Sequence, residues 1–294
     1  MSEGTVEARH KHLAQQARRF RARKRVYTAI CYAVLALACA GALGPYFYLL
    51  STSLKKTSYL YSYPPQWFSW PPNLVNYQTL LTQYPFLRWA LNTLIVAGTV
   101  TAIKVCIDSL AGYAFARLRF PGKEAIFLAM LAAMMIPFST MLVPLYLMVR
   151  SMGLLNTYAG LILPALASPI GIFMMRQFVE ALPAELDSAA RVDRCSEFGV
   201  YWHIILPLMK PALVVLGIYT FMTQWTSFLW PLVATTSNDM YVLTVGVQSI
   251  KTIYTTDWGL ISAGSVLTMI PITVVFILLQ RYFIAASIAG ALKS

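Results

Sequence analysis

Long stretches without a charged residue dominate this chain and restrict what it can fold into. Five of them carry no Asp, Glu, Lys or Arg, and each reaches the roughly 20 residues that an α-helix needs to cross a bilayer. A sixth, Trp89–Ala116, is interrupted only by Lys104 and Asp108. Because backbone polar groups in lipid must be satisfied within the chain, such stretches favour helices. The five uninterrupted stretches are Val26–Leu50, Ala125–Val149, Ser151–Met175, Pro211–Asn238 and Trp258–Gln280.

These stretches predict an all-α integral membrane protein with six transmembrane helices. The composition agrees, because 58% of the residues are hydrophobic and only 12% are charged, against about 25% charged residues in soluble domains. We expect a basic arm at residues 1–25 and a single transmembrane domain at residues 26–294. A charged loop at about residues 180–210 interrupts that domain.

The basic residues are distributed unevenly along the chain. Eight of the 23 Lys and Arg residues precede the first span. Placing that end in the cytoplasm puts 17 basic residues inside and five outside, with Lys104 within a span. The positive-inside rule therefore predicts that both termini and the charged loop are cytoplasmic. The net charge of +12 then indicates contact with anionic lipid headgroups and not with nucleic acid.

Two ionisable residues, Lys104 and Asp108, lie inside a predicted span. They are four residues apart, so they share one helix face and can form an ion pair. Ionisable groups at this depth usually face the bundle interior or water, which makes a functional site the default hypothesis. A structural clip and a snorkelling lysine are the alternatives. Prolines in other spans predict kinks, and they are Pro137, Pro144, Pro164, Pro169, Pro231 and Pro271.

The loop Ser51–Leu87 is rich in proline and aromatic residues. Trp and Tyr favour the boundary between membrane and water, so we expect a short helix around Leu74–Leu81 near that surface. Two interpretations stay open: an interfacial anchor, and a docking platform for an external partner.

Several kinds of chemistry have no counterpart in the sequence. The phosphate-binding pattern G-x-x-x-x-G-K-[ST] does not occur, so we do not expect this chain to bind or hydrolyse ATP. Its three His and four Cys residues lack metal-ligand spacing, and no Ser, His and Asp are arranged as a triad. The sequence therefore predicts neither an enzyme nor a cofactor or metal site in this chain.

The charged loop is expected to contain two short helices. Pro183 suits a first helical turn, and Glu185 and Asp187 are favourable at the positive end of the helix dipole. A second helix is expected from Ser196. Two short helices with alanine at the tip predict a protruding knob that fits into a groove of a partner protein. The alternative is that the loop is only a solvated connector between two spans.

Four motifs occur in order along the chain. The stretch E-L-D-S-A-A-R-V-D-R-C-S-E-F-x-x-x-W-x-I-x-L-P-L-x-x-P, beginning at Glu185, resembles the EAA loop of importer-type ABC permeases. The others are L-A-G-Y-A-F-A-R-L-R-F-P-G at Leu110–Gly122, W-x-x-F-L-W-P-L at Trp225–Leu232 and I-A-G-A-L-K-S from Ile288. From roughly Ile30 onward, the chain is similar to carbohydrate-uptake permeases related to the maltose-type inner subunit.

This resemblance implies a permease subunit of an ATP-driven importer for a sugar or related polar solute, multi-pass in the bacterial cytoplasmic (plasma) membrane. The implied partners are a second permease subunit, two copies of an ATPase that bind ATP and Mg, and an extracytoplasmic solute-binding protein. The first helix of the loop would be a coupling helix seated in the ATPase. The residues implied for coupling are Glu185, Asp187, Ser188, Ala189, Ala190, Arg191, Asp193 and Arg194.

Two positions depart from the family pattern. Ser188 stands where the family usually has Glu, and Arg194 stands where it has Gly. Glu185 lies three residues before Ser188 on the same helix face, whereas Asp187 points about 100° away. We therefore hypothesise that Glu185 supplies the anionic contact to the ATPase. Arg194 implies either that the bend needs no positive φ or that the partner surface accepts its charge.

Aromatic faces and polar groups commonly bind sugars, so some residues of the spans are candidates to line a substrate path, with helix packing as the alternative. These residues leave open whether the solute is a disaccharide, a polyol or a glycerol-3-phosphate-like compound. A stand-alone channel or ion-coupled carrier would predict inverted repeats or more intramembrane charges, which are not visible. A scaffold for a cytoplasmic partner is a third function. The candidate lining residues are Asn92, Tyr219, Trp225 and Trp230.

Overall fold

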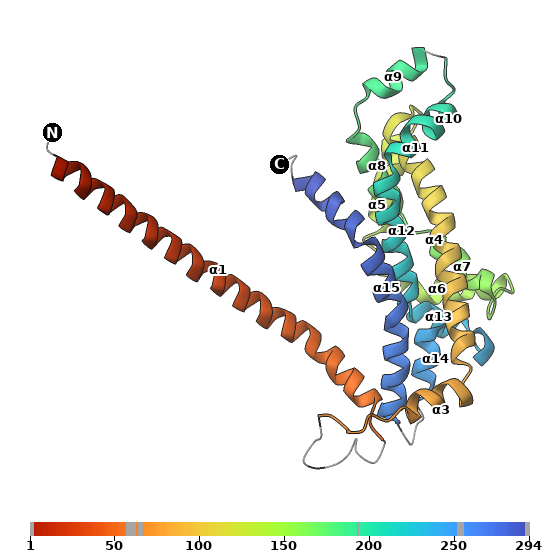
Figure 1. Ribbon diagram of the computed structural model, residues 1–294. Helices are drawn as coiled ribbons and strands as arrows, with labels where there is room; N and C mark the ends of the chain where they lie inside the picture. Colours follow the sequence, from red (N-terminus) through yellow and green to blue (C-terminus); the bar gives the residue numbers. More distant parts are fainter. Residues whose placement is uncertain (1–2, 57–62, 64–66, 193, 252–255, 292–294) are drawn as a thin grey trace.

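A computed structural model describes residues 3–56, 63, 67–192, 194–251 and 256–291, and helices are the regular secondary structure of this part of the chain (Figure 1). The elements are α1 (Glu3–Ser53), α3 (Val75–Gln83), α4 (Phe86–Arg117), α5 (Lys123–Ala133), α6 (Phe138–Ser151), α7 (Tyr158–Leu166), α8 (Ile170–Glu180), α9 (Glu185–Val192), α10 (Glu197–Val200), the π-helix η1 (Tyr201–Ile205), α11 (Leu206–Leu208), α12 (Lys210–Trp225), α13 (Leu229–Ala234), the 3-10 helix η2 (Asn238–Met240), α14 (Leu243–Ser249) and α15 (Trp258–Ala291).

Three helical segments of the described chain are long and apolar enough to cross a membrane. They are Arg23–Ser53 in α1, the whole of α4, and Trp258–Gln280 in α15. Three further pairs of helices reach that length only together, because each pair bends by more than 40° at a short break. The number of candidate spans is therefore three, or up to six if each bent pair counts as one. The bent pairs are α5 with α6 (101°), α7 with α8 (41°), and Glu197–Leu208 with α12 (77°).

Three of the predicted spans are not single helices. The stretch Ala125–Val149 is divided, because α5 ends at Ala133 and Pro137 precedes α6. The stretch Ser151–Met175 starts with a turn, and its helix is interrupted just before α8, where Pro169 stands. Proline has no N–H to continue a helical ladder, which explains why a new helix begins after each of these residues. The stretch Pro211–Asn238 is helical only to Trp225 before a break.

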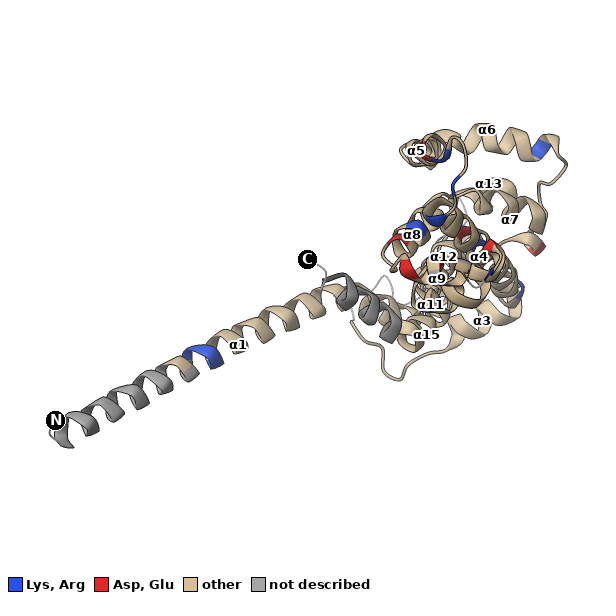
Figure 2. Ribbon diagram, turned by 90° about the horizontal axis from the view of Figure 1, so that it is seen from above, with Lys and Arg blue, Asp and Glu red and all other residues tan. Residues whose placement is uncertain are grey.

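The centre of the bundle consists of α4, α8, α12 and α15, which run alongside one another (Figure 1). Gly112 lets α4 approach α8 closely, because a Cβ at this position would collide with Met175. Seen from the end, α5 and α6 stand at the edge of this bundle (Figure 2). The long helix α1 diverges from it and packs against α15 near the C-terminal end of α1 (Figure 1).

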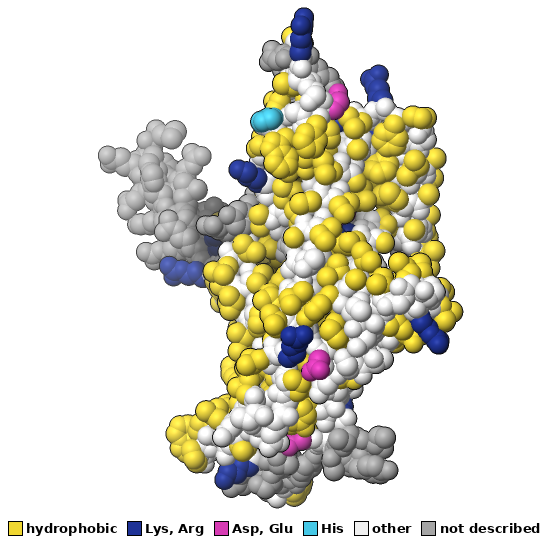
Figure 3. All heavy atoms as spheres, turned by 90° about the vertical axis from the view of Figure 1, so that its right-hand side faces the viewer, with side chains coloured by type: hydrophobic (Ala, Val, Ile, Leu, Met, Phe, Trp, Pro, Cys, Tyr) yellow, Lys and Arg dark blue, Asp and Glu magenta, His cyan; other side chains and the backbone are white. Residues whose placement is uncertain are grey.

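The short helix α3 confirms the helix predicted around Leu74–Leu81. It lies at the end of the bundle opposite α9 and α10 (Figure 1). Asn76 fixes α3 to the end of α1, since its Nδ2 donates hydrogen bonds of 2.8 Å to the carbonyls of Ser53 and Lys55. Hydrophobic side chains cover much of the face shown in Figure 3, as expected for a chain surrounded by lipid.

Candidate functional site

The predicted loop lies at one end of the bundle, where α9 projects beyond α10 (Glu197–Val200) and is joined to it by a short turn (Figure 1). Its first helix, α9, begins at Glu185, two residues after Pro183, and has Glu185 and Asp187 in its first turn. The second helix begins after Ser196, whose hydroxyl accepts a hydrogen bond of 3.1 Å from the Gly199 amide. Both helices expected in the loop are therefore present, although Pro183 lies before the first turn and not in it.

The two faces of α9 have different surroundings. Asp187 is 2% exposed and Ala190 is 4% exposed, and Ala190 packs in an apolar cluster with Val200. Glu185 and Ser188 are exposed on another face of the helix. The prediction of alanine at the tip is thus wrong for Ala190, because its small side chain allows α9 to lie close against the second helix. The side chains of Ala189 and Arg191 and the whole of Asp193 lie outside the described residues.

Asp187 forms an ion pair with Arg117, the last residue of α4. Arg117 Nε lies 2.7 Å from Asp187 Oδ2, and the two side chains are only 12% and 3% exposed. Arg117 Nη2 also donates a hydrogen bond of 2.6 Å to the Leu182 carbonyl. Asp187 is therefore engaged within the chain, whereas Glu185 is exposed. The geometry agrees with the separation of these two carboxylates expected from the helical period.

Two other residues of α4 bind the second helix of the loop. Tyr113 Oη donates a hydrogen bond of 3.0 Å to Glu197 Oε2. One turn earlier, Ser109 shares a hydrogen bond of 2.8 Å with the hydroxyl of Tyr201. Ser109, Tyr113 and Arg117 are spaced four residues apart and so line one face of α4. We call these three residues the α4 ladder.

The α4 ladder was missed by reasoning from the sequence. The signal for it is a polar residue at every fourth position of an otherwise apolar helix, within the motif Leu110–Gly122 and one residue before it. The partners could not be found in this way, because Arg117 and Asp187 are 70 residues apart.

Arg194 adopts a left-handed conformation with φ of 57°. The Cys195 amide donates a hydrogen bond of 3.1 Å to the Ala190 carbonyl. A bond of this span together with a left-handed residue just before the donor is typical of the Schellman motif that ends helices, where glycine is usual. Of the two interpretations of Arg194, the one without positive φ is therefore wrong.

Lys104 and Asp108 form the expected ion pair inside the bundle. Lys104 Nζ lies 3.0 Å from Asp108 Oδ2, and it donates a hydrogen bond of 2.9 Å to the Ser168 carbonyl. Asp108 lies against Gly171, where any side chain would collide with its carboxylate. The pair thus contacts the break between α7 and α8 and the first turn of α8. This arrangement agrees with a structural clip that joins α4 to that break.

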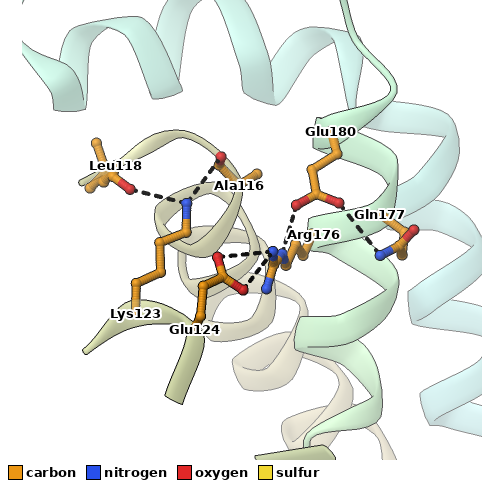
Figure 4. Close-up of polar contacts among 7 residues, drawn as sticks. All are labelled: Ala116, Leu118, Lys123, Glu124, Arg176, Gln177 and Glu180. Carbon is orange, nitrogen blue, oxygen red and sulfur yellow. Dashed lines mark hydrogen bonds and ion pairs between the residues drawn. The ribbon is translucent and has the colours of Figure 1, made fainter. Parts of the chain in front are cut away.

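A second arginine, Arg176, connects α8 to α5 (Figure 4). Its Nε lies 2.7 Å from Glu180 Oε1, and its Nη2 lies 3.3 Å from Glu124 Oε2. The guanidinium also lies over the ring of Phe127, 3.9 Å from the ring centre. This cluster, which the sequence analysis did not anticipate, does not include the loop helices.

Three of the four candidate lining residues use their polar groups within the chain. Asn92 Nδ2 donates to the carbonyls of Asp239 (2.7 Å) and Tyr241 (2.8 Å). The indole of Trp225 donates to the Thr268 carbonyl at 3.0 Å. The indole of Trp230 donates to the Gly160 carbonyl, also at 3.0 Å. These contacts favour helix packing for Asn92, Trp225 and Trp230.

The fourth candidate, Tyr219, is 40% exposed and lines a cavity of about 700 Å³ with Thr223 and Gln224. The cavity is bounded by residues of α5, α6, α7 and α8, and its walls are mainly apolar. Most of its polar side chains, Tyr219, Thr223 and Gln224, lie on α12, and Ser168 is the other one. Among the described residues, no group of three or more His, Cys, Asp or Glu side chains is placed to hold a metal ion.

Comparisons with known proteins agree with this architecture. Residues 108–287 match the family model described as binding-protein-dependent transport system inner membrane component. The arabinooligosaccharides transport system permease protein AraQ of Halalkalibacterium halodurans is 40% identical over 208 residues, which cover 71% of this chain and 75% of that protein. The lactose transport system permease protein LacG of Rhizobium radiobacter is 30% identical over 275 residues, covering 92% and 98%.

A solved structure shares the fold. The crystal structure of a bacterial ABC transporter involved in the import of the acidic polysaccharide alginate contains a chain that matches with a TM-score of 0.78 at 20% identity. The match covers 88% of this chain and 97% of that one.

Proposed function

Because the chain belongs to the family of binding-protein-dependent transport system inner membrane components, we propose that it is the sugar-translocating permease subunit of an ABC importer. The relatives named for arabinooligosaccharide and lactose transport support sugars as the class of solute. The structural observation that carries the proposal is α9. Its buried face is bound to α4 through Asp187 and Arg117, and its other face is exposed.

The exposed face of α9 is the proposed contact for an ATPase that binds ATP and Mg. Glu185 and Ser188 are exposed on it, and Leu186 adds a partly exposed apolar side chain. Closure of an ATPase dimer would displace α9, and rigid contacts would transmit that displacement to the bundle. A second permease subunit would complete the path, and an extracytoplasmic solute-binding protein would deliver the sugar.

The proposed orientation places α9 and both termini in the cytoplasm, with the chain crossing the bacterial cytoplasmic membrane several times. The distribution of basic residues supports it. The helix α3 lies at the opposite end of the bundle and would then face outward, where a solute-binding protein can reach it (Figure 1).

Within the bundle, Tyr219 is the proposed residue for contact with the sugar. Its partly exposed ring and the neighbouring Thr223 and Gln224 place an aromatic face and polar groups at one cavity. Asn92 and Trp230 hold the surrounding segments in position through the hydrogen bonds described above.

Reconstitution in vesicles tests the proposal. The chain is coexpressed with its second permease subunit and the ATPase, and the purified complex is supplied with the binding protein and a labelled arabinooligosaccharide or lactose. We expect uptake that requires ATP and all subunits. Uptake by this chain alone, without ATP, would contradict the proposal and would favour a stand-alone channel or carrier.

A further inference from the structure

We propose that Arg117 is a positioning residue that fixes the orientation of α9 relative to α4, so that movement of α9 is delivered to the bundle through α4. The inference rests on the proposed function in one respect: the movement of α9 is taken to come from the ATPase. The contacts of Arg117 can be tested without it.

Arg117 holds the chain on both sides of the turn that leads into α9. Its Nη2 donates to the Leu182 carbonyl at 2.6 Å, before the helix, and its Nε forms an ion pair, without hydrogen-bond geometry, 2.7 Å from Asp187 Oδ2 in the first turn. One planar guanidinium therefore binds two points five residues apart. Lysine, with a single ammonium group, cannot reproduce this fork.

Arg117 is the ion-pair partner of Asp187, and Arg119 and Lys123 line the same cavity beside it. Oδ1 of Asp187 is buried and has no hydrogen-bond partner among the described residues. The polar contact of this carboxylate is therefore the ion pair between Oδ2 and Arg117. Removal of Arg117 would leave a buried, unpaired charge, which is strongly unfavourable. The first turn of α9 would then move toward solvent so that Asp187 could be hydrated.

The hydrogen bonds of the other two members of the α4 ladder go to the second helix of the loop. Tyr113 binds Glu197 in α10, and Ser109 binds Tyr201 in the π-helix. Both bonds therefore hold the second helix of the loop against α4. Apart from Arg117, the buried side of α9 offers Ala190, which packs through a small apolar surface. The ion pair of Arg117 with Asp187 is thus the charged contact that ties α9 directly to α4, beside the apolar cluster around Ala190.

The test compares Arg117→Gln with Arg176→Gln. The two arginine side chains are about equally buried, 12% and 13% exposed, and each has Nε 2.7 Å from a carboxylate; the carboxylates around Arg176 are 37% and 72% exposed, against 3% for Asp187. The ion-pair partners of Arg176 are Glu124 in α5 and Glu180 in α8 (Figure 4). A general loss of packing would affect both variants, whereas a positioning role in the loop would affect only Arg117→Gln.

The first measurement is hydrogen–deuterium exchange of the α9 amides in the purified complex. We expect exchange of residues 185–192 to rise by about tenfold or more in Arg117→Gln, since a buried pair is broken. Arg176→Gln should leave these amides unchanged. If Arg117→Gln accumulates poorly, Asp187→Ala replaces it, because this variant breaks the same ion pair from the α9 side and should also raise the exchange of the α9 amides. Unchanged α9 exchange in both loop variants would overturn the inference.

The second measurement is the number of sugar molecules imported per ATP hydrolysed by the complex. We expect this ratio to fall by about tenfold in Arg117→Gln, to recover partly in Arg117→Lys, and to stay normal in Arg176→Gln. Equal ratios in the two glutamine variants would overturn the role in transmission. Absence of ATP-dependent uptake in the unmodified complex would contradict the proposed function, while the exchange measurement would still decide the role of Arg117.

Discussion

Replacing Arg194 with glycine should stabilise the turn that ends α9. With φ of 57°, Arg194 occupies a region that costs an L-residue with a Cβ about 1–2 kcal/mol. Glycine avoids this cost, but it loses roughly 0.5–1 kcal/mol more conformational entropy on folding than alanine does. The difference leaves a gain of about 0.7 kcal/mol in the free energy of opening the turn, or roughly a threefold change in the opening equilibrium.

Exchange of the Cys195 amide measures this gain, because that amide closes the turn by donating to Ala190. In Arg194→Gly we expect the exchange to slow by about threefold, which follows from the free-energy difference above. Arg194→Ala is the matched control, since it removes the same charge and most of the side chain but keeps the Cβ. If the exchange of the Cys195 amide slows by the same factor in both variants, the source of strain is crowding by the Arg194 side chain and not the backbone conformation. Unchanged exchange in the glycine variant would refute the reasoning altogether.

Three further changes test other parts of the structure. Lys104→Met should lower the free energy of unfolding in detergent by about 3–5 kcal/mol, because it leaves Asp108 buried and unpaired. The double variant Lys104→Met/Asp108→Leu should regain most of the lost free energy of unfolding. If the double variant stays as unstable as Lys104→Met, the pair is not a structural clip. Gly171→Ala should lower the free energy of unfolding by about 1–3 kcal/mol, since the new methyl group meets the Asp108 carboxylate. An unchanged free energy of unfolding would contradict this contact. Glu185→Lys should reduce copurification of the ATPase while α9 amide exchange stays normal, and full retention of the ATPase would exclude Glu185 as the anionic contact.

The sequence was sufficient to predict the helical spans but not their straightness. Continuous hydrophobicity located α4 and the apolar part of α15 with little error. The same criterion merged α5 and α6 into one span, because it measures polarity along the chain and carries no information on direction. Six prolines in these spans predicted kinks, yet Pro137 and Pro169 precede new helices whereas Pro144 lies inside α6.

Prediction of the candidate site was limited by long-range contacts. The helical period separated Glu185 from Asp187 correctly, since that separation is a local property of one helix. The partner of Asp187 depends on how α4 and the loop meet in space, which no local pattern contains. The conformation of Arg194 was undecided for a related reason: a non-glycine residue tolerates positive φ only when surrounding contacts compensate for it.

The ion pair at the break between α7 and α8 bears on the electrical properties of transport. Moving one elementary charge through the full membrane potential involves about 2.3 kcal/mol per 100 mV. Lys104 and Asp108 carry opposite charges 3.0 Å apart on one helix, so any displacement of α4 moves them together and transfers no net charge. The pair itself therefore adds no net charge movement when α4 shifts, so the voltage across the membrane neither drives nor opposes that step through these two residues.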